Sequence, residues 1–315
     1  MNKKPSEKSK LVFKLLLLLS AAAVMLGLLS FVGKKSNESA ELVASNFATY
    51  DILRAITKDT NQDIKLLVQP GTDIHHYEPS QQDIIDIQAS KLFVYVGGES
   101  EEWVESIIQD EQKTLKLMDA EGLTILNEDG EDEIDEHVWT APSNFILMLQ
   151  ATEKKLSEIY PENSAKYQEN ADEYIAKIQE ASSQIKTIAK DLPTMIFADR
   201  FPAKYFVDEY NLDYIAAFSG CAEDTEADPA TLAKIIDLTK ESKGKYIFTI
   251  ELSDQKLAKT VAESTGVEII TFQRMQNISS TDFEQNKTYL DLMKENIETL
   301  KKVAEWQFSK QKSFQ

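Results

Sequence analysis

A long amphipathic segment near the middle of the chain most constrains the fold. Residues 163–190 form the longest helical pattern, and their apolar positions recur at steps of seven, four, three, four and three. These positions are Tyr167, Tyr174, Ile178, Ala181, Ile185 and Ile188. The spacing predicts one continuous apolar face along about 42 Å of helix. The periodicity alone leaves open whether this helix joins two lobes or forms a coiled-coil arm.

Short apolar runs alternate with helical patterns on both sides of this segment. Such alternation is typical of parallel sheets whose faces are covered by helices. Strands are expected at 42–46, 64–68, 91–96, 114–118, 194–198, 213–218, 245–250 and 267–272. Further helices are expected at 50–58, 81–90, 103–109, 144–160, 229–242, 255–265 and 283–307. At 315 residues the chain is long enough for two lobes with separate cores.

The net charge of the chain limits the classes of partner that it can bind. The formal net charge is −19, which disfavours nucleic acid and anionic membrane surfaces as partners. Seven acidic residues fall within 128–136, and this run is either a solvated loop or a segment that gathers cations. Cys221 is the chain's one cysteine, so no internal disulfide is expected.

The N-terminal segment predicts export. Five lysines precede the apolar run 15–33, which would span about 28 Å as a helix, close to the thickness of a bilayer core. No cysteine follows the run closely enough for a lipid anchor, and the small-residue pattern of a cleavage site is poor around 31–33. We expect an uncleaved anchor with its lysine-rich end in the cytoplasm, which places the rest of the chain outside. A cleaved signal peptide is the alternative.

All three histidines lie in two short loop segments. His75 and His76 fall between a Pro-Gly turn and a second proline, directly after an apolar run. Adjacent side chains of an extended segment point to opposite sides, so these two imidazoles cannot both face one ion. His137 lies in a second segment, also ahead of a proline and a helix. Imidazole is a good ligand for zinc and its first-row neighbours and a poor one for magnesium or calcium.

These two segments resemble the motifs of the metal-specific solute-binding proteins that serve ABC importers. The first, 70–79, reads Pro-Gly-x-x-x-His-x-Tyr-Glu-Pro, and the second, 135–142, reads Asp-x-His-Val-Trp-x-x-Pro. Both occur in the family's order and spacing, and the wider similarity covers about 42–304. The resemblance implies two lobes, each a mostly parallel sheet flanked by helices, joined by one long rigid helix with the ligand cleft between them. It also implies an exported, monomeric receptor that binds Zn²⁺, with Mn²⁺ as the alternative, and delivers it to an ABC permease.

The resemblance also implies ligands. His75 and His137 match the two family histidines, and His76 falls at a variable position. In the C-terminal lobe, Glu251 and Asp254 are the carboxylates of the fourth-ligand segment, although Asp254 is equally well placed to cap a helix.

This chain departs from the family pattern at the third metal-ligand position. Counting back from the Tyr-Phe pair lands on Arg200, which stays protonated and cannot coordinate a cation. Either Asp199 takes the role through a shift of one residue, or Arg200 pairs with a carboxylate of the site and water completes the shell. Cys221 is a further, weaker candidate ligand.

The implied organisation divides the chain into an anchor and tether at 1–40, lobes at 41–162 and 193–315, and a linking helix at 163–192. The implied activity is binding without catalysis, since a filled metal shell lacks the open position that catalytic zinc keeps for water. Two rival functions remain. One is an envelope metallohydrolase with an open site, in which Glu251 serves as the base. The other is a metal-binding, adhesin-like surface protein.

Overall fold

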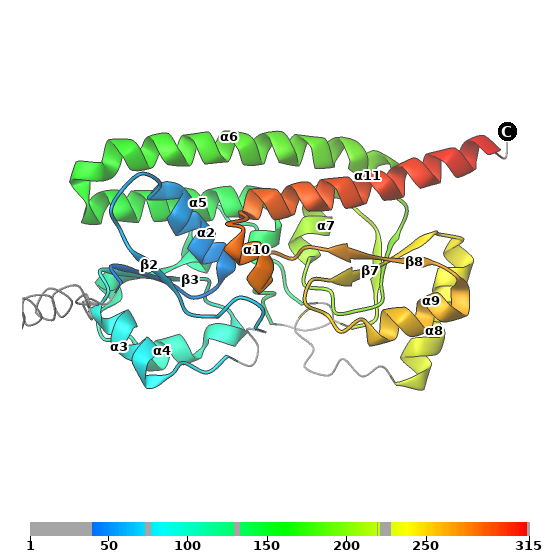
Figure 1. The fold of residues 1–315 in the computed structure, drawn as a ribbon, viewed down its shortest axis with the longest axis horizontal. Helices are drawn as coiled ribbons and strands as arrows, with labels where there is room; N and C mark the ends of the chain where they lie inside the picture. The colour runs from blue at the N-terminus through cyan, green and yellow to red at the C-terminus, as the bar shows by residue number, and fades with distance from the viewer. Residues whose placement is uncertain (1–39, 73–76, 129–132, 219, 221–227, 314–315) are drawn as a thin grey trace, which may run out of the picture. The chain divides into compact units, whose positions relative to one another are not determined.

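The computed structural model describes residues 40–313, except 73–76, 129–132, 219 and 221–227. These residues form two sheets of four strands, and every strand pairing in them is parallel (Figure 1). The predicted α/β class with two parallel sheets is therefore confirmed. The apolar run 15–33 lies outside the described residues. Within the described part, none of the helices combines the length and apolar character that crossing a membrane requires.

The N-terminal lobe is built around the sheet β2-β1-β3-β4. Its strands are β1 (Leu42–Ala44), β2 (Ile64–Leu66), β3 (Leu92–Tyr95) and β4 (Thr114–Lys116). Its helices are α2 (Phe47–Ile56), α3 (Gln81–Ala89), α4 (Trp103–Ile107) and α5 (Pro142–Ile159). The central strands β1 and β3 are buried on both faces, which explains why they appear in the sequence as unbroken apolar runs.

The C-terminal lobe repeats the plan with the sheet β6-β5-β7-β8. Its strands are β5 (Met195–Phe197), β6 (Tyr214–Ala216), β7 (Tyr246–Ile250) and β8 (Glu268–Phe272). Its helices are α7 (Lys204–Tyr210), α8 (Pro229–Ser242), α9 (Lys256–Thr265), α10 (Ser280–Glu284) and α11 (Tyr289–Ser313). Because all strands are parallel, their carboxyl ends meet at one edge of each sheet.

The predicted long helix is α6 (Ser164–Ile188), which runs alongside both lobes next to α11 (Figure 1). Its predicted apolar face is confirmed: Tyr167, Ile178 and Ile185 are fully buried. They belong to one apolar cluster that also contains Val94 of the first sheet and Phe248 of the second sheet. The core is therefore continuous from one lobe to the other, and the helix joins the lobes instead of forming a coiled-coil arm.

Three helix predictions differ from the structure. Helix α2 begins three residues earlier than expected, because Asn46 and Thr49 form a reciprocal capping box. The helix expected at 283–307 is two helices, since the backbone turns left-handed at Asn286 and a new cap forms at Thr288. Helix α7 was not predicted, because its seven residues are too few for a clear periodicity.

A buried carboxylate on α2 connects three helices. Asp51 is 1% exposed, and its Oδ1 accepts a hydrogen bond from Arg54 Nε at 3.0 Å. Its Oδ2 accepts bonds from the Tyr174 hydroxyl of α6 at 2.5 Å and from the Tyr289 N–H of α11 at 3.0 Å. A negative charge at the first N–H of α11 also complements the positive end of that helix's dipole. Asp51 thus fixes α11 against α6.

We predict that Asp51→Ala lowers the free energy of unfolding by about 3 kcal/mol, because it leaves buried donors on three helices without an acceptor. Tyr174→Phe removes one of these bonds and should cost about 1 kcal/mol. Urea unfolding followed by circular dichroism measures both. If Asp51→Ala lowered the free energy of unfolding by less than Tyr174→Phe does, the role of Asp51 in linking the helices would be contradicted.

Candidate metal-binding site

His137 is the best-defined candidate ligand. It is fully buried and lies between the bridge of Asn127 with Ile134 and the short helix Val138–Thr140. Asp135 Oδ1 accepts a hydrogen bond from the His137 backbone N–H and lies 2.8 Å from its Nδ1. A proton held on Nδ1 by this carboxylate leaves the lone pair on Nε2, which is the form that a metal binds.

The charges around His137 favour a cation. Burial acts to lower the pKa of His137, but the carboxylates of Asp135 and Glu136 outweigh it, and the pKa is raised. Arg274 acts in the opposite direction, so its guanidinium is close enough to be felt at the imidazole. Burial also acts to raise the pKa of Asp135, yet its bonds to His137 leave that pKa lowered. The two side chains therefore stabilise each other's charged forms.

The other candidate ligands lie at the carboxyl ends of the C-terminal strands. Asp199 follows β5 and is 7% exposed. Its Oδ1 accepts a hydrogen bond from the Arg200 N–H at 2.9 Å, whereas its buried Oδ2 has no hydrogen-bond partner among the described residues. A buried polar atom without a partner points to a missing water or ion. Asp199 thus has an oxygen available for a ligand.

Glu251 follows β7 and is held by Arg274. The backbone N–H of Arg274 donates to Oε2 at 2.7 Å, and its Nε donates to Oε1 at 3.1 Å. Burial raises the pKa of Glu251 to about 7, although Arg274 acts against this. The Arg274 carbonyl in turn accepts a bond from Trp139 Nε1, two residues from His137. Glu251 is therefore tied through Arg274 to the His137 loop.

Asp254 is in a different environment. Its side chain is 60% exposed, Oδ1 accepts the first backbone N–H of α9 from Lys256 at 2.9 Å, and Oδ2 lies 2.9 Å from Lys256 Nζ. These are the bonds of a residue that stabilises a helix start. Asp254, Asp199 and Arg200 line one small cavity of about 100 Å³, so the structure brings two of the three predicted carboxylates together.

Gln276 was missed in the sequence, where only charged, histidine and cysteine side chains were considered. It is 1% exposed, and neither atom of its amide group has a hydrogen-bond partner within the described part of the chain. The next residue, Asn277, donates to the carbonyls of Gln69 and Thr72, which lead to the first histidine segment. The signal for it was the four polar residues Gln273, Arg274, Gln276 and Asn277 directly after the expected strand 267–272.

The remaining predicted residues lie outside the described part: His75, His76 and Cys221. The segment before His75 is anchored, since the Gly71 N–H donates to the Ile278 carbonyl at 2.8 Å. Among the described residues, no three His, Cys, Asp or Glu side chains are grouped closely enough to hold a metal ion.

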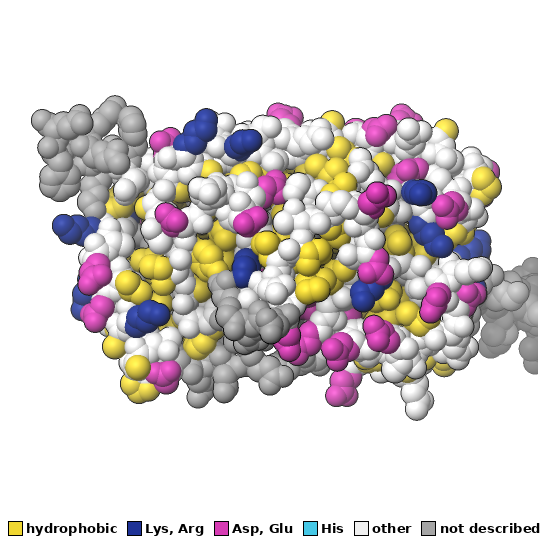
Figure 2. Space-filling model, turned by 180° about the vertical axis from the view of Figure 1, so that it is seen from behind, with side chains coloured by type: hydrophobic (Ala, Val, Ile, Leu, Met, Phe, Trp, Pro, Cys, Tyr) yellow, Lys and Arg dark blue, Asp and Glu magenta, His cyan; other side chains and the backbone are white. Residues whose placement is uncertain are grey.

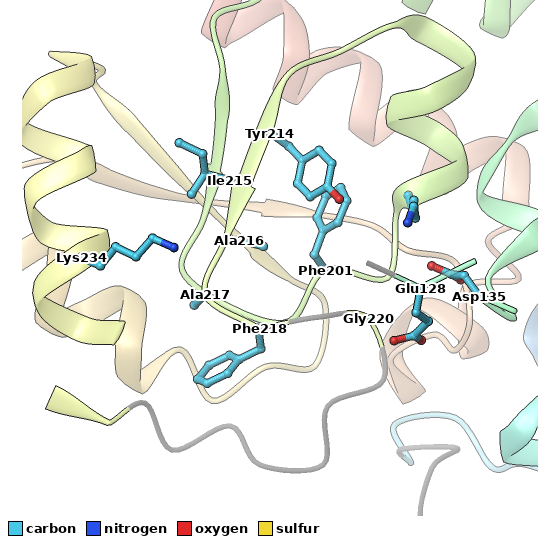
Figure 3. Close-up of a pocket in the computed structure, with 11 residues that line it drawn as sticks. Glu128, Asp135, Phe201, Tyr214, Ile215, Ala216, Ala217, Phe218, Gly220 and Lys234 are labelled. Atoms are coloured by element: carbon cyan, nitrogen blue, oxygen red, sulfur yellow. The ribbon is translucent and has the colours of Figure 1, made fainter. Parts of the chain in front are cut away.

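A larger cavity of about 520 Å³ is lined by Asp135, the partner of His137 (Figure 3). Glu128 and Asp135 lie at one end of it and Lys234 at the other. Gly220 also lines it, and a Cβ atom at this position would be 3.6 Å from His137 Cε1. Gly220, after β6, therefore lies close to the histidine ring. On the face shown in Figure 2, acidic and basic side chains are interspersed without a single extended basic patch.

Glu101 is a second buried acid near this region. It is 3% exposed, and its Oε2 accepts the Gly97 N–H at 2.7 Å. Burial, with a smaller contribution from Glu136, raises its pKa to about 7. A raised carboxyl pKa means that the protonated form is favoured in the folded state. The stability that this group contributes is complete below pH 4.5 and is lost as the pH rises through about 7.

We predict that Glu101→Gln stabilises the protein at alkaline pH. Ionised Glu101 should cost the folded state about 3 kcal/mol above its pKa, a cost that the amide does not carry. Urea unfolding of both proteins across this pH range should give similar stabilities near pH 4.5 and a growing advantage for the variant above it. Parallel stability curves would show that the carboxyl group is not perturbed.

Comparison with known proteins places this geometry in context. Residues 42–303 match the family model described as zinc-uptake complex component A, periplasmic. The chain is 29% identical over 279 residues to the high-affinity zinc uptake system protein ZnuA of Bacillus subtilis, covering 82% of this chain and 86% of that protein. It is 26% identical over 288 residues to the zinc-binding lipoprotein AdcA of Streptococcus pneumoniae, covering 86% of this chain. The match spans only 57% of AdcA's length.

Solved structures support the fold. The laminin-binding protein Lmb of Streptococcus agalactiae, described as a bifunctional protein with adhesin and metal transporting activity, has a TM-score of 0.74 at 25% identity. That match covers 84% of this chain and 99% of Lmb. The Zn(II)-bound ZnuA-like domain of S. pneumoniae AdcA has a TM-score of 0.69 at 27% identity, covering 84% of this chain and 99% of that domain.

Proposed function

Since the chain belongs to the family of zinc-uptake complex component A, we propose that it is an extracytoplasmic receptor that captures a divalent transition metal and delivers it to an ABC permease. The observation that carries the proposal is the buried His137, whose Nδ1 lies 2.8 Å from Asp135 Oδ1, the pairing by which a carboxylate orients a metal-binding imidazole. Zinc is the proposed cargo, because relatives of this chain are named as zinc-binding proteins. The protein has no need of a catalytic step in this role.

We propose His75 and His137 as the ligands from the N-terminal lobe and Asp199 as the first ligand from the C-terminal lobe. Asp199 is preferred because its Oδ2 is buried without a partner in the described residues. Asp254 ranks next, since it lines the same small cavity but already binds the start of α9. Glu251 ranks last, because both of its oxygens accept bonds from Arg274.

The donor set bears on the choice of metal. Two imidazoles with carboxylate oxygen form a harder site than three imidazoles, which reduces the margin of zinc over manganese without reversing the Irving–Williams order. We therefore keep manganese as the second candidate cargo. Elemental analysis of the detergent-solubilised full chain, after equilibration with equimolar zinc, manganese and iron, tests this choice. Retention of iron alone would contradict both assignments.

Two rival functions have different support. A metallohydrolase would need a general base beside the ion, and Glu251, the residue proposed for that role, is bound to Arg274. An adhesin role in addition to metal binding finds support in the description of Lmb. Hydrolytic turnover by the metal-loaded protein would favour the first rival, and metal-dependent binding to an extracellular-matrix protein would favour the second.

We further propose that the segment 15–33 anchors a monomeric receptor to the outer side of the cytoplasmic membrane. In this proposal residues 1–40 form the anchor and tether, 41–162 and 193–315 the lobes, and 163–192 the linking helix. N-terminal sequencing of the membrane fraction tests the anchor. A mature protein that starts near Ser36 would support a cleaved signal peptide instead.

We predict that His137→Ala weakens zinc binding by at least a hundredfold, about 2.7 kcal/mol, and Asp199→Ala by at least tenfold, about 1.4 kcal/mol. Asp254→Ala is the matched control, since it removes an exposed carboxylate from the same cavity and should change affinity less than threefold. Competition titration with a chelating dye measures all three. A larger loss for Asp254→Ala than for Asp199→Ala would reverse the proposed order.

The first histidine segment gives an independent prediction. His75→Ala should weaken zinc binding by at least a hundredfold, about 2.7 kcal/mol, whereas His76→Ala should have little effect because adjacent side chains point to opposite sides. The same dye competition applies. If the His76 variant is the impaired one, the alignment of the motif is shifted by one residue.

A further inference from the structure

Glu136 is a buried carboxylate directly before His137. It is 3% exposed, although no metal or catalytic role was predicted for it. Both of its oxygens accept hydrogen bonds from Ser100, Oε2 from the backbone N–H at 2.9 Å and Oε1 from the hydroxyl at 2.7 Å. Accepting at both oxygens is the pattern of an ionised carboxylate. Its own carbonyl accepts the Val138 N–H and so shapes the turn that carries His137.

The surrounding chain leaves space for this side chain. Gly98 lies against it, and a Cβ atom at position 98 would be 2.1 Å from Glu136 Cβ and 2.2 Å from Oε2. Any other residue at position 98 would therefore displace the carboxylate. The glycine and the two Ser100 donors together form a fitted position for an acidic side chain behind the histidine.

A buried charge is an expensive way to hold a loop. Moving a carboxylate out of water is unfavourable, and a neutral side chain that bonds Ser100 would hold the turn without that cost. A buried charge also acts more strongly on its surroundings than a surface charge does, since its field is little screened by water or salt. The charge of Glu136 is therefore felt at His137, where it acts to raise the pKa, and it would act in the same way on a cation bound there.

We propose that Glu136 sets the preference of the site for divalent cations by supplying negative charge behind His137. This inference rests on the proposed function and adds a residue that tunes affinity without coordinating the metal. Glu136 acts on His137 in the same direction as the acidic Asp135 and against the basic Arg274, and it also acts on the buried Glu101.

The test separates the charge of Glu136 from its hydrogen bonds. Glu136→Gln removes the charge, while its amide still bonds Ser100, because a hydroxyl both donates and accepts. Ser100→Ala is the matched control, since it removes one bond and keeps the charge. Each variant and the full-length wild type are titrated with Zn²⁺ and, in chloride-free buffer, with Ag⁺ as a monovalent ion that binds imidazole. Thermal melting of the metal-free proteins checks that all are folded.

Coulomb energy scales with ionic charge, so Glu136→Gln should weaken Zn²⁺ binding by about tenfold and Ag⁺ binding by only about threefold. Ser100→Ala should change both by less than threefold. Equal losses for the two ions, or none, would overturn the charge role and leave the receptor function intact. Failure of the wild type to bind either ion would overturn the proposed function and this inference with it.

Discussion

Both sheets of this protein are wholly parallel, and that constraint decides where its polar chemistry lies. Parallel neighbours need crossover connections, which cover both faces of the sheet and leave the strands buried and apolar. Polar side chains are then left for the strand ends. Glu251 comes directly after β7, and Asp199 and Arg274 come two residues after β5 and β8. The register pairs Ile250 with Phe272, so Glu251 and the residues after β8 are neighbours.

The two lobes meet through a small number of directional contacts as well as through the shared core. Arg274 binds Glu251 with its backbone and its guanidinium, and its carbonyl accepts the indole N–H of Trp139. Asn277 extends the same loop to the carbonyls before the first histidine segment. One loop of the C-terminal lobe therefore contacts both of the segments that carry histidines. A change in the position of either lobe would be felt at these bonds.

The site combines buried groups of both signs. Asp135 and Glu136 flank His137, while Arg274 lies on the other lobe and reduces their effect on the imidazole. Gln276, two residues after Arg274, contributes a buried amide group that has no hydrogen-bond partner among the described residues. In the proposed cation site, Asp135 and Glu136 supply negative charge from the N-terminal lobe, and Asp199 is the C-terminal carboxylate that keeps an oxygen available among the described residues.

The sequence by itself determined the parallel α/β class, the long helix with its buried face, and the two histidine segments. These are local properties, carried by periodicity and by contiguous motifs, and they do not depend on distant partners. The helix starts at Asn46 and Thr288 could be located only from the capping hydrogen bonds in the structure. Only the tertiary structure distinguished the environments of the C-terminal carboxylates, because Glu251 is bound by Arg274, which lies 23 residues away in the sequence. It also identified Gln276, since an amide without partners is recognised only once the packing around it is known.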